Sequence, residues 1–422
     1  MDFIQKLKLV WHDGSLRKRL LFIGVMLVVF RLLSAIPIPG IDTAKLASFL
    51  ADNQFFGLLN IFSGGGLSNL SIVMLGVGPY ITASIIMQLL TMMSPKLKQM
   101  YQEEGEAGRA KFAQYSRVIS VPLSLIQAFS FLIILSRQGI FTGAGLFSTI
   151  TNVLIITAGS LLVMWIGELM TEYGIGNGTS LIIFAGIVSR LPEAIGQLAF
   201  TFDPGQLPMY LGFLVLAILV VWGVVIVTEA ERPIPVTYAK RVRGAKVYGG
   251  VSTYLPMRVN QAGVIPIIFA LSIMLFPQMI ATVLGAFDNA MLHTISTFLT
   301  TVFANQWVYS ILYFILVFLF TYFYTAVTFD PITISTNLQK NGAFIPGVRP
   351  GESTSSYIAS VVTRITLVGA TFLAIVAVLP LVMRGITGDQ SLAIGGTALL
   401  IVVSVVLDFI KKIDAQVSMR EY

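Results

Sequence analysis

The stretch that decides the fold is IVMLGVGPYITASIIMQLLTMM, from Ile72 to Met93. It contains no charged residue, but glycines and Pro79 interrupt it, and Ser63-Gly64-Gly65-Gly66 comes shortly before it. A helix rises about 1.5 Å per residue, so a run of this length crosses a hydrocarbon core of about 30 Å. Interrupted backbone is tolerated at that depth only inside protein or beside a water-filled cavity. The stretch therefore predicts a membrane span next to an internal aqueous path.

The composition also predicts a protein that crosses the membrane several times. Hydrophobic residues make up 56% of the chain, charged residues 11%, and the mean hydropathy is +0.85. Soluble domains carry about 25% charged residues. The chain has no cysteine, which excludes disulfides, thiolate metal sites and cysteine nucleophiles. The basic, amphipathic residues 1–19 precede an apolar run with no small-residue cleavage site, so we expect that run to be retained as a span.

Ten apolar runs are long enough to cross a bilayer. They are Leu20–Ile36, Ile72–Met93, Val118–Ser136, Thr149–Met170, Thr179–Phe200, Met209–Thr228, Ala262–Leu284, Trp307–Phe329, Ile365–Met383 and Ser391–Ile410. Ten crossings place both termini on one side. Of the 27 lysines and arginines, only Arg31, Lys45, Arg137, Arg190 and Arg384 lie at the opposite ends of spans. The positive-inside rule therefore predicts cytoplasmic termini, and the basic charge does not require a nucleic acid partner.

Two of the cytoplasmic connections are unusually long, Glu229–Gln261 and Asp330–Tyr357. The first alternates β-forming residues about Arg243-Gly244, which predicts a hairpin. The second contains turn-forming pairs such as Pro346-Gly347, which predict a tip that holds Arg349 away from the bilayer. Such loops indicate a docking surface, and the alternative that they are only solvated connectors stays open.

The external connection Pro37–Ser71 contains a mildly apolar segment that is too short to cross the membrane, Asn60–Ser71. We expect it to re-enter as a short helix with Leu67 and Leu70 on one side, attached through the glycines to the following span. An ordinary glycine-rich surface turn is the alternative.

The sequence shows no reaction centre. His12 and His293 are the only histidines and lie outside the predicted spans, so metal and triad chemistry lack ligands. Gly174–Gly178 superficially resembles a phosphate-binding turn, but it has neither a preceding strand nor a P-loop lysine. A tight cytoplasmic turn explains it better.

Uncharged polar residues lie in or beside several spans, namely Gln88, Gln127, Asn260 and Ser272. These side chains prefer protein or water to lipid. Hydrogen bonds in helix packing explain them most simply. The alternative is a seam between helices that opens without exposing charge, since Pro79, Pro266 and Pro277 loosen backbone pairing nearby.

Six motifs, in order along nearly the whole chain, carry a resemblance to the SecY family of membrane channels. They are Ile36-Pro37-Ile38-Pro39-Gly40, Phe62-Ser63-Gly64-Gly65, Gly78-Pro79-Tyr80-Ile81-Thr82-Ala83-Ser84-Ile85-Ile86, Gly174-Ile175-Gly176-Asn177-Gly178, Ala262-Gly263-Val264-Ile265-Pro266 and Ile345-Pro346-Gly347-Val348-Arg349-Pro350-Gly351. The number of spans and the placement of the loops match as well.

The resemblance implies an all-α fold of ten transmembrane helices in two five-helix halves around a central hourglass pore. The halves, related by a pseudo-twofold axis, are residues 20–200 and 201–410, with a cytoplasmic arm at 1–19 and a tail at 411–422. By similarity, the pore constriction consists of Val77, Ile81, Thr179, Ile183, Ile268 and Ile401. The plug that closes the pore consists of Asn60, Ser63, Gly64, Gly65, Gly66, Leu67 and Leu70.

Thr179 departs from the aliphatic residues usual in this ring. Either its assignment belongs to a neighbouring residue, or the seal relies on the plug and the other five side chains. The resemblance also implies a lateral gate between the second and third spans on one side and the seventh and eighth on the other. Its residues are Gln88, Gln127, Asn260, Ser272 and Phe276.

The implied function is passage of unfolded secretory polypeptides and sideways release of hydrophobic signal segments into lipid. A ring of aliphatic side chains suits this task, because it stops ions by dewetting and offers a passing chain no charge. The family is not enzymatic and uses no cofactor or metal. Its energy comes from the SecA ATPase or the translating ribosome, docked on the two cytoplasmic loops, where Arg243 and Arg349 are the expected docking residues.

The other implied partners are SecE and SecG subunits, signal peptides and lipid, and the implied location is the inner (plasma) membrane. Two other classes of protein agree less well with the sequence. A secondary transporter would need acidic residues in the central thirds of the spans, and an intramembrane enzyme would need a histidine or cysteine there.

Overall fold

The structure is a computed structural model of the chain. It describes residues 12–39, 63, 65–67, 70–102, 104–137, 139–141, 145–189, 191–192, 196, 205, 207–238, 241–243, 246–248, 252–285, 289–387 and 395–418. Most of these residues are helical, and a helix lies in each of the ten ranges that the sequence predicts as spans.

The first part of the chain forms helices joined by turns. They are α2 (Gly14–Leu33), α5 (Gly78–Met93), α6 (Pro95–Gln102), α7 (Gly105–Arg137), α8 (Leu146–Tyr173) and α9 (Gly178–Val188). Asp13 caps α2 by accepting hydrogen bonds from the backbone N–H groups of Ser15 and Leu16, and Asn177 caps α9 in the same way. The glycine-rich motif before α9 is therefore a tight turn, as predicted.

The second part combines helices with short strands. They are α11 (Leu207–Glu229), β1 (Glu231–Tyr238), β2 (Arg241–Arg243), β3 (Lys246–Tyr248), β4 (Ser252–Arg258), α12 (Ile265–Leu284), α13 (Ala290–Ala304), α14 (Gln306–Thr328), α15 (Pro331–Lys340), β5 (Ala343–Phe344), α16 (Glu352–Thr387) and α17 (Gly395–Ser418).

One predicted span begins later than the sequence indicates. The run from Ile72 is helical only from Gly78, and residues 72–77 form turns. The cause lies in α8: Ser160 Oγ donates a hydrogen bond to the Gly76 carbonyl at 2.9 Å, and a Cβ on Gly159 would overlap the Ile72 carbonyl. Contact with α8 and the positive φ of Gly76, 52°, therefore delay the helix.

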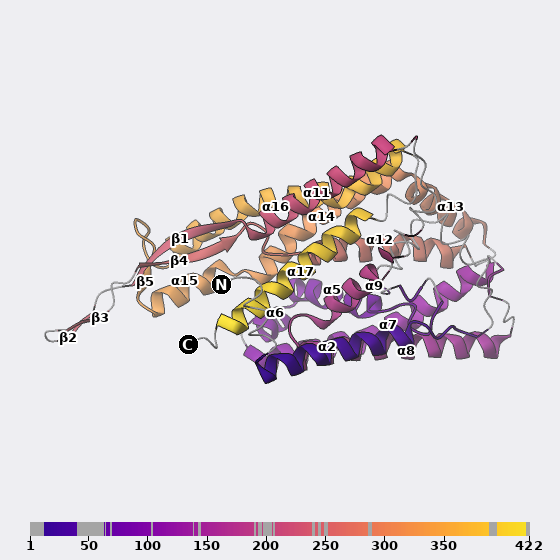
Figure 1. Cartoon of the computed structure of the whole chain (residues 1–422), viewed down its shortest axis with the longest axis horizontal. Coiled ribbons are helices and arrows are strands. Elements are labelled where there is room, and N and C mark those ends of the chain that lie inside the picture. Colours follow the sequence, from indigo (N-terminus) through magenta and orange to yellow (C-terminus); the bar gives the residue numbers. More distant parts are fainter. Residues whose placement is uncertain are drawn as a thin grey trace.

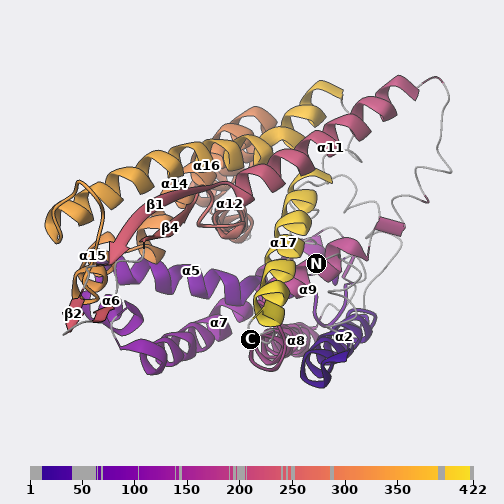
Figure 2. The same cartoon turned by 60° about the vertical axis from the view of Figure 1, so that its left-hand side comes forward.

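The helices run mostly along the long axis of the molecule, with the β1–β4 hairpin at one end and α13 at the other (Figure 1). Figure 2 shows α11, α14 and α16 on one side and α2, α7 and α8 on the other. Two helices lie between these groups, directly or through α5 and α9. Helix α12 contacts α5, α7 and α14, and α17 contacts α9, α11 and α16.

The two long connections that the sequence predicts on the cytoplasmic side fold together. β1 pairs with β4 in an antiparallel hairpin, and β2 pairs with β3 nearer its tip, as predicted. Strand β5 of the second connection pairs with β1, and Ile234, Val236 and Ile345 share a buried cluster with α16. We call these strands with α15, residues 231–258 and 331–351, the platform. Within the described residues, β1, β4 and β5 join the two connections in one sheet, whereas β2 and β3 form a separate two-stranded sheet.

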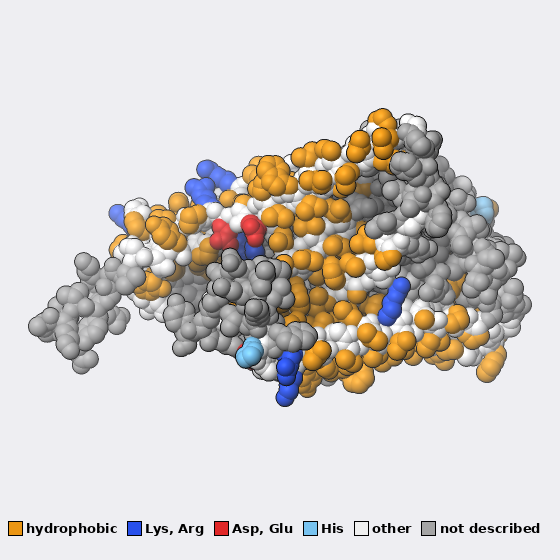
Figure 3. All heavy atoms as spheres, in the orientation of Figure 1, with side chains coloured by type: hydrophobic (Ala, Val, Ile, Leu, Met, Phe, Trp, Pro, Cys, Tyr) orange, Lys and Arg blue, Asp and Glu red, His pale blue; other side chains and the backbone are white. Residues whose placement is uncertain are grey.

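The outer surface of the helices is apolar. Five helical segments within the described residues are long and apolar enough to cross a membrane, and they include α7, α8, α11, α14 and α16. On α11 the side chains of Leu214, Ile218 and Trp222 are 58%, 59% and 64% exposed. Figure 3 shows hydrophobic side chains covering the visible face of the helices, with charged ones mainly toward the platform end. Such a surface is suited to lipid.

Candidate functional site

Five of the six predicted constriction residues lie in one apolar cluster. Val77, Ile183, Ile268 and Ile401 are buried there, and the partly buried Ile81 packs against it. They come from the turn before α5 and from α5, α9, α12 and α17, so elements far apart in sequence contribute these residues to one large cluster. We call these five residues the waist.

Thr179 differs from the waist residues in what it contacts. Its hydroxyl donates a hydrogen bond to Asn177 Oδ1 at 2.5 Å, and its methyl group would lie 3.0 Å from a Cβ on Gly167 of α8. The side chain is only partly buried. Its place in the ring stays a prediction.

A polar cavity of about 270 Å³ lies beside the waist. Its walls include the beginnings of α9 and α12 and the last part of α17, with Ser180, Asn260 and Ser404 among the polar residues. Ile183 lies about one helical turn after the lining residue Ser180, and Ile268 about one turn after Ile265. Ile401 lies about one turn before Ser404. The cavity therefore adjoins the waist on the side of the platform.

Charged residues surround the cavity but are paired. Lys412 Nζ lies 2.7 Å from Asp408 Oδ2, and Lys411 Nζ lies 3.8 Å from Glu229 Oε1. Within the part of the chain that the structure describes, no group of three histidine or acidic side chains is arranged to hold a metal ion. Sequence reasoning did not find Ser404, whereas the glycine-rich turn before α9 and Asn260, which both line this cavity, were noted from the sequence.

Four of the five predicted gate residues lie on helices that contact one another, since α12 contacts both α5 and α7. Gln88 is on α5, Gln127 on α7, and Ser272 and Phe276 on α12, with Asn260 shortly before it. Asn260 and Ser272 are buried. The buried Oε1 of Gln88 and Oδ1 of Asn260 have no hydrogen-bond partner among the described residues. An unpaired buried oxygen costs free energy, so these helices meet without a complete set of polar contacts.

The predicted plug is described at Ser63, 65–67 and Leu70, whereas Asn60 and Gly64 lie outside the described residues. We call its described residues together with 71–77 the plug segment. The described residues of this segment form turns, and residues 60–62, 64, 68 and 69 of the expected short helix lie outside the described residues. Side-chain hydrogen bonds compete with helical pairing here: Ser63 Oγ accepts from the Leu67 N–H at 3.0 Å, and Ser71 Oγ donates to the Gly66 carbonyl at 2.9 Å.

The plug segment is held by apolar contacts. Leu67 and Leu70 are 1% and 0% exposed and share a cluster with Phe131 and Leu135 of α7 and Ile156 of α8. Both leucines thus lie on the same buried side, as expected. Whether this segment closes a pore stays a prediction.

The two predicted docking residues lie on the platform. Arg349 is exposed, and Thr354 Oγ1 donates a hydrogen bond to its carbonyl at 2.8 Å. Arg243 ends β2 and is paired with Lys246 of β3. Both positions lie in the connections between helices, as predicted.

Apolar helices, a buried waist and an adjoining polar cavity define a multi-pass helical membrane protein with a candidate passage at its centre. The profile of the SecY family matches residues 71–410. The chain belongs to the SecY family.

The relatives in this family match over almost their whole length. Protein translocase subunit SecY of Escherichia coli (strain K12) is 44% identical over 97% of this chain and 93% of its own. The subunit of the same name from Corynebacterium glutamicum is 42% identical over 98% of this chain and 97% of its own.

Solved structures share the fold. A structure described as a protein-conducting channel matches with a TM-score of 0.64 at 19% identity, covering 94% of this chain and 91% of that chain. Sec61 in the canine ribosome-channel complex from the endoplasmic reticulum matches with a TM-score of 0.59 at 18% identity, with the same coverage.

Proposed function

We propose that this chain is the channel subunit of a protein translocase, which passes unfolded secretory polypeptides through the membrane and releases hydrophobic segments sideways into lipid. The relatives at 40% identity or more are named translocase subunits, and a solved neighbour is described as a protein-conducting channel. The observation that carries the proposal is the polar cavity that adjoins the waist.

The physical properties of these two regions match the task. A polypeptide enters the polar cavity, where Ser180, Ser404 and Asn177 keep it hydrated. It then passes the waist, which has no charge and no hydrogen-bonding side chain to retain it. Without a polypeptide, the aliphatic side chains exclude water and therefore ions.

The ten helices in the predicted ranges are the ten spans, in two halves of five at residues 20–200 and 201–410. The lateral gate lies between α5 and α7 on one side and α12 and α14 on the other. The unpaired oxygens of Gln88 and Asn260 support a seam that few polar contacts hold closed.

The energy of signal binding suffices to open such a seam. Burying about fifteen CH₂ equivalents of a signal segment at about 0.8 kcal/mol each yields about 12 kcal/mol. An intramembrane hydrogen bond contributes only about 1 kcal/mol. Signal binding therefore biases the gate without any chemical step in this chain.

The driving force comes from partners. The platform, with Arg243 and Arg349, docks the SecA ATPase or the ribosome, and SecE and SecG complete the complex. Solved neighbours include channels bound to ribosomes. The chain lies in the inner membrane with both termini in the cytoplasm, on the side of the platform.

Crosslinking to a transported chain tests the proposal. A photoreactive residue at Ile81 of the waist should crosslink to a stalled secretory polypeptide, because the chain must pass this point. A photoreactive residue at Leu214, which is exposed on α11, is the matched control and should crosslink to lipid. A polypeptide that crosslinks to Leu214 and not to Ile81 would contradict the proposed path.

A further inference from the structure

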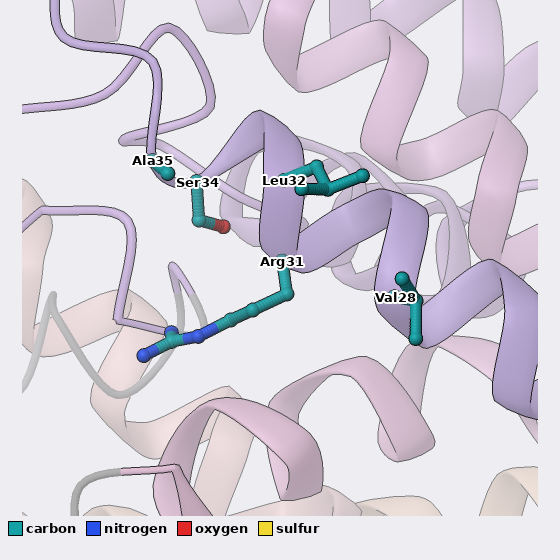
Figure 4. A pocket seen from close by; sticks show the side chains of 5 residues that line it. All are labelled: Val28, Arg31, Leu32, Ser34 and Ala35. Carbon is teal, nitrogen blue, oxygen red and sulfur yellow. The ribbon is translucent and has the colours of Figure 1, made fainter.

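Arg31 lies in the last turn of α2, at the end away from the platform. It lines an opening of about 360 Å³ together with Val28, Leu32, Ser34 and Ala35. In Figure 4 the Arg31 side chain extends away from α2 across this opening toward a neighbouring segment of the chain, whereas Val28 and Leu32 present only apolar groups. Arg31 is exposed, and the feature to explain is the direction of its side chain, toward the chain rather than away from it.

The guanidinium reaches the plug segment. A Cβ placed on Gly65 would lie 3.4 Å from Nη1 of Arg31, 3.8 Å from the carbonyl oxygen of Gly186 and 3.9 Å from Oγ of Ser189. Gly65 has a φ of +86°, a backbone conformation that glycine adopts without strain. Gly65 therefore sits between Arg31 of α2 and the end of α9.

The surroundings suit a positive charge. Helix C-termini carry a partial negative charge. Arg31 lies in the last turn of α2, and Gly65, next to its guanidinium, also faces the last turn of α9, where Ser189 is the C-cap and donates to the Gly186 carbonyl at 2.9 Å. The planar guanidinium has five N–H donors in a fixed geometry. It can therefore face the plug backbone and the α9 carbonyls at the same time.

We propose that Arg31 is a positioning residue that holds the plug segment against α9 in the resting channel. The inference rests on the proposed function. Ile183 of the waist lies on α9, one turn before Gly186. A movement of α9 that widens the waist also withdraws Gly186 and Ser189 from Gly65, so the waist and the plug are released together.

Cysteine labelling at rest tests this role. The chain has no cysteine, so Leu67→Cys introduces a unique reporter at a buried position of the plug segment. In proteoliposomes, a membrane-impermeant maleimide on both sides should label this cysteine about tenfold faster when Arg31→Ala is added, the effect expected for loss of one charge-assisted contact. Val28→Ala lines the same opening and is the matched control, expected to label at the parent rate.

A second variant excludes a simple anchoring role. Arg31→Lys keeps a positive charge at the same depth in the membrane, but lacks the planar group with five donors. Labelling faster than in the Val28→Ala control supports the proposal. Labelling at the parent rate in Arg31→Lys would overturn it, and so would equal rates in Arg31→Ala and Val28→Ala.

The reporter needs no partner and no transport. A failure of the Ile81 crosslink would count against the proposed function, whereas unchanged labelling in the Arg31 variants would count only against this role of Arg31.

Discussion

Two glycine-rich loops of this chain have opposite environments. In the plug segment, Leu67 and Leu70 are buried, and a Cβ on Gly66 would lie 2.9 Å from the Val73 carbonyl. In the tip of the platform, residues 341–351, Arg349 is exposed, and a Cβ on Gly347 would meet nothing within 4 Å. Glycine allows close packing in the first loop, whereas in the second it allows only the positive φ of a turn, 82° at Gly347. The same composition thus occurs in a buried, closely packed segment and in an exposed turn.

The largest effect should come from removing apolar side chains of the waist. The triple variant Ile81→Gly, Ile183→Gly and Ile268→Gly should conduct small ions at rest, many times more than the parent, because water then enters the waist. Single-channel recording in planar bilayers measures this. Three glycines at the exposed Leu211, Leu214 and Ile218 of α11 are the control. Unchanged resting conductance would mean that the constriction lies elsewhere or that the plug segment alone forms the seal.

A substitution in α8 tests the close packing of the plug segment. Gly159→Ala should destabilise the protein by about 1–3 kcal/mol, because the added Cβ overlaps the Ile72 carbonyl. Gly212→Ala on α11, where nothing lies within 4 Å, should be neutral or stabilising by up to about 1 kcal/mol. Thermal unfolding in detergent measures both, and equal melting temperatures would refute the close contact.

In the tip of the platform, a change of charge should affect transport more than a change of packing. Arg349→Glu should reduce SecA-driven transport about tenfold by repelling or losing a docked partner, while insertion into the membrane stays normal. Lys340→Glu makes the same change of charge at the end of α15 and should have a weaker effect. Normal ATP-dependent transport by Arg349→Glu would remove the docking role of this residue.

The smallest effect should come from removing one hydrogen bond of the plug segment. Ser160→Ala removes the donor to the Gly76 carbonyl and should cost about 1 kcal/mol in the free energy of unfolding. Thr363→Val removes an exposed hydroxyl that bonds only within its own helix and should change that free energy by less than about 0.5 kcal/mol. Equal unfolding midpoints of the two variants would count against a structural role for this bond.

Local patterns predicted much of the fold. Apolar runs located helices in ten ranges, and alternating β-formers located the hairpin. The failures were tertiary in origin. The turn at residues 72–77 depends on Gly159 and Ser160, which lie far away in the sequence, and the pairing of β5 with β1 joins two separate loops. No window of sequence contains such contacts.

The candidate site was predictable to a different degree in each part. Hydropathy alone does not single out Ile183 or Ile401 from many similar residues, and only the family resemblance assigned them. The polar residues Gln88 and Asn260 stood out in apolar runs, but the sequence could not reveal that their oxygens lack partners in the described part of the chain. Thr179 was recognised as unusual, and its hydrogen bond to Asn177 Oδ1 accounts for a hydroxyl at that position.

The pairing of β5 with β1 has a mechanical consequence. The first loop of the platform joins α11 to α12 and the second joins α14 to α16. At the base of the hairpin the Val259 N–H donates to the Ala230 carbonyl at 2.9 Å. A Cβ on Gly369 of α16 would lie 2.6 Å from the Val259 carbonyl, so this base is wedged against α16. The sheet is therefore held at its base against α16 and leads directly into α12, the helix that contacts α5 and α7, so a force applied to either loop would act on that helix.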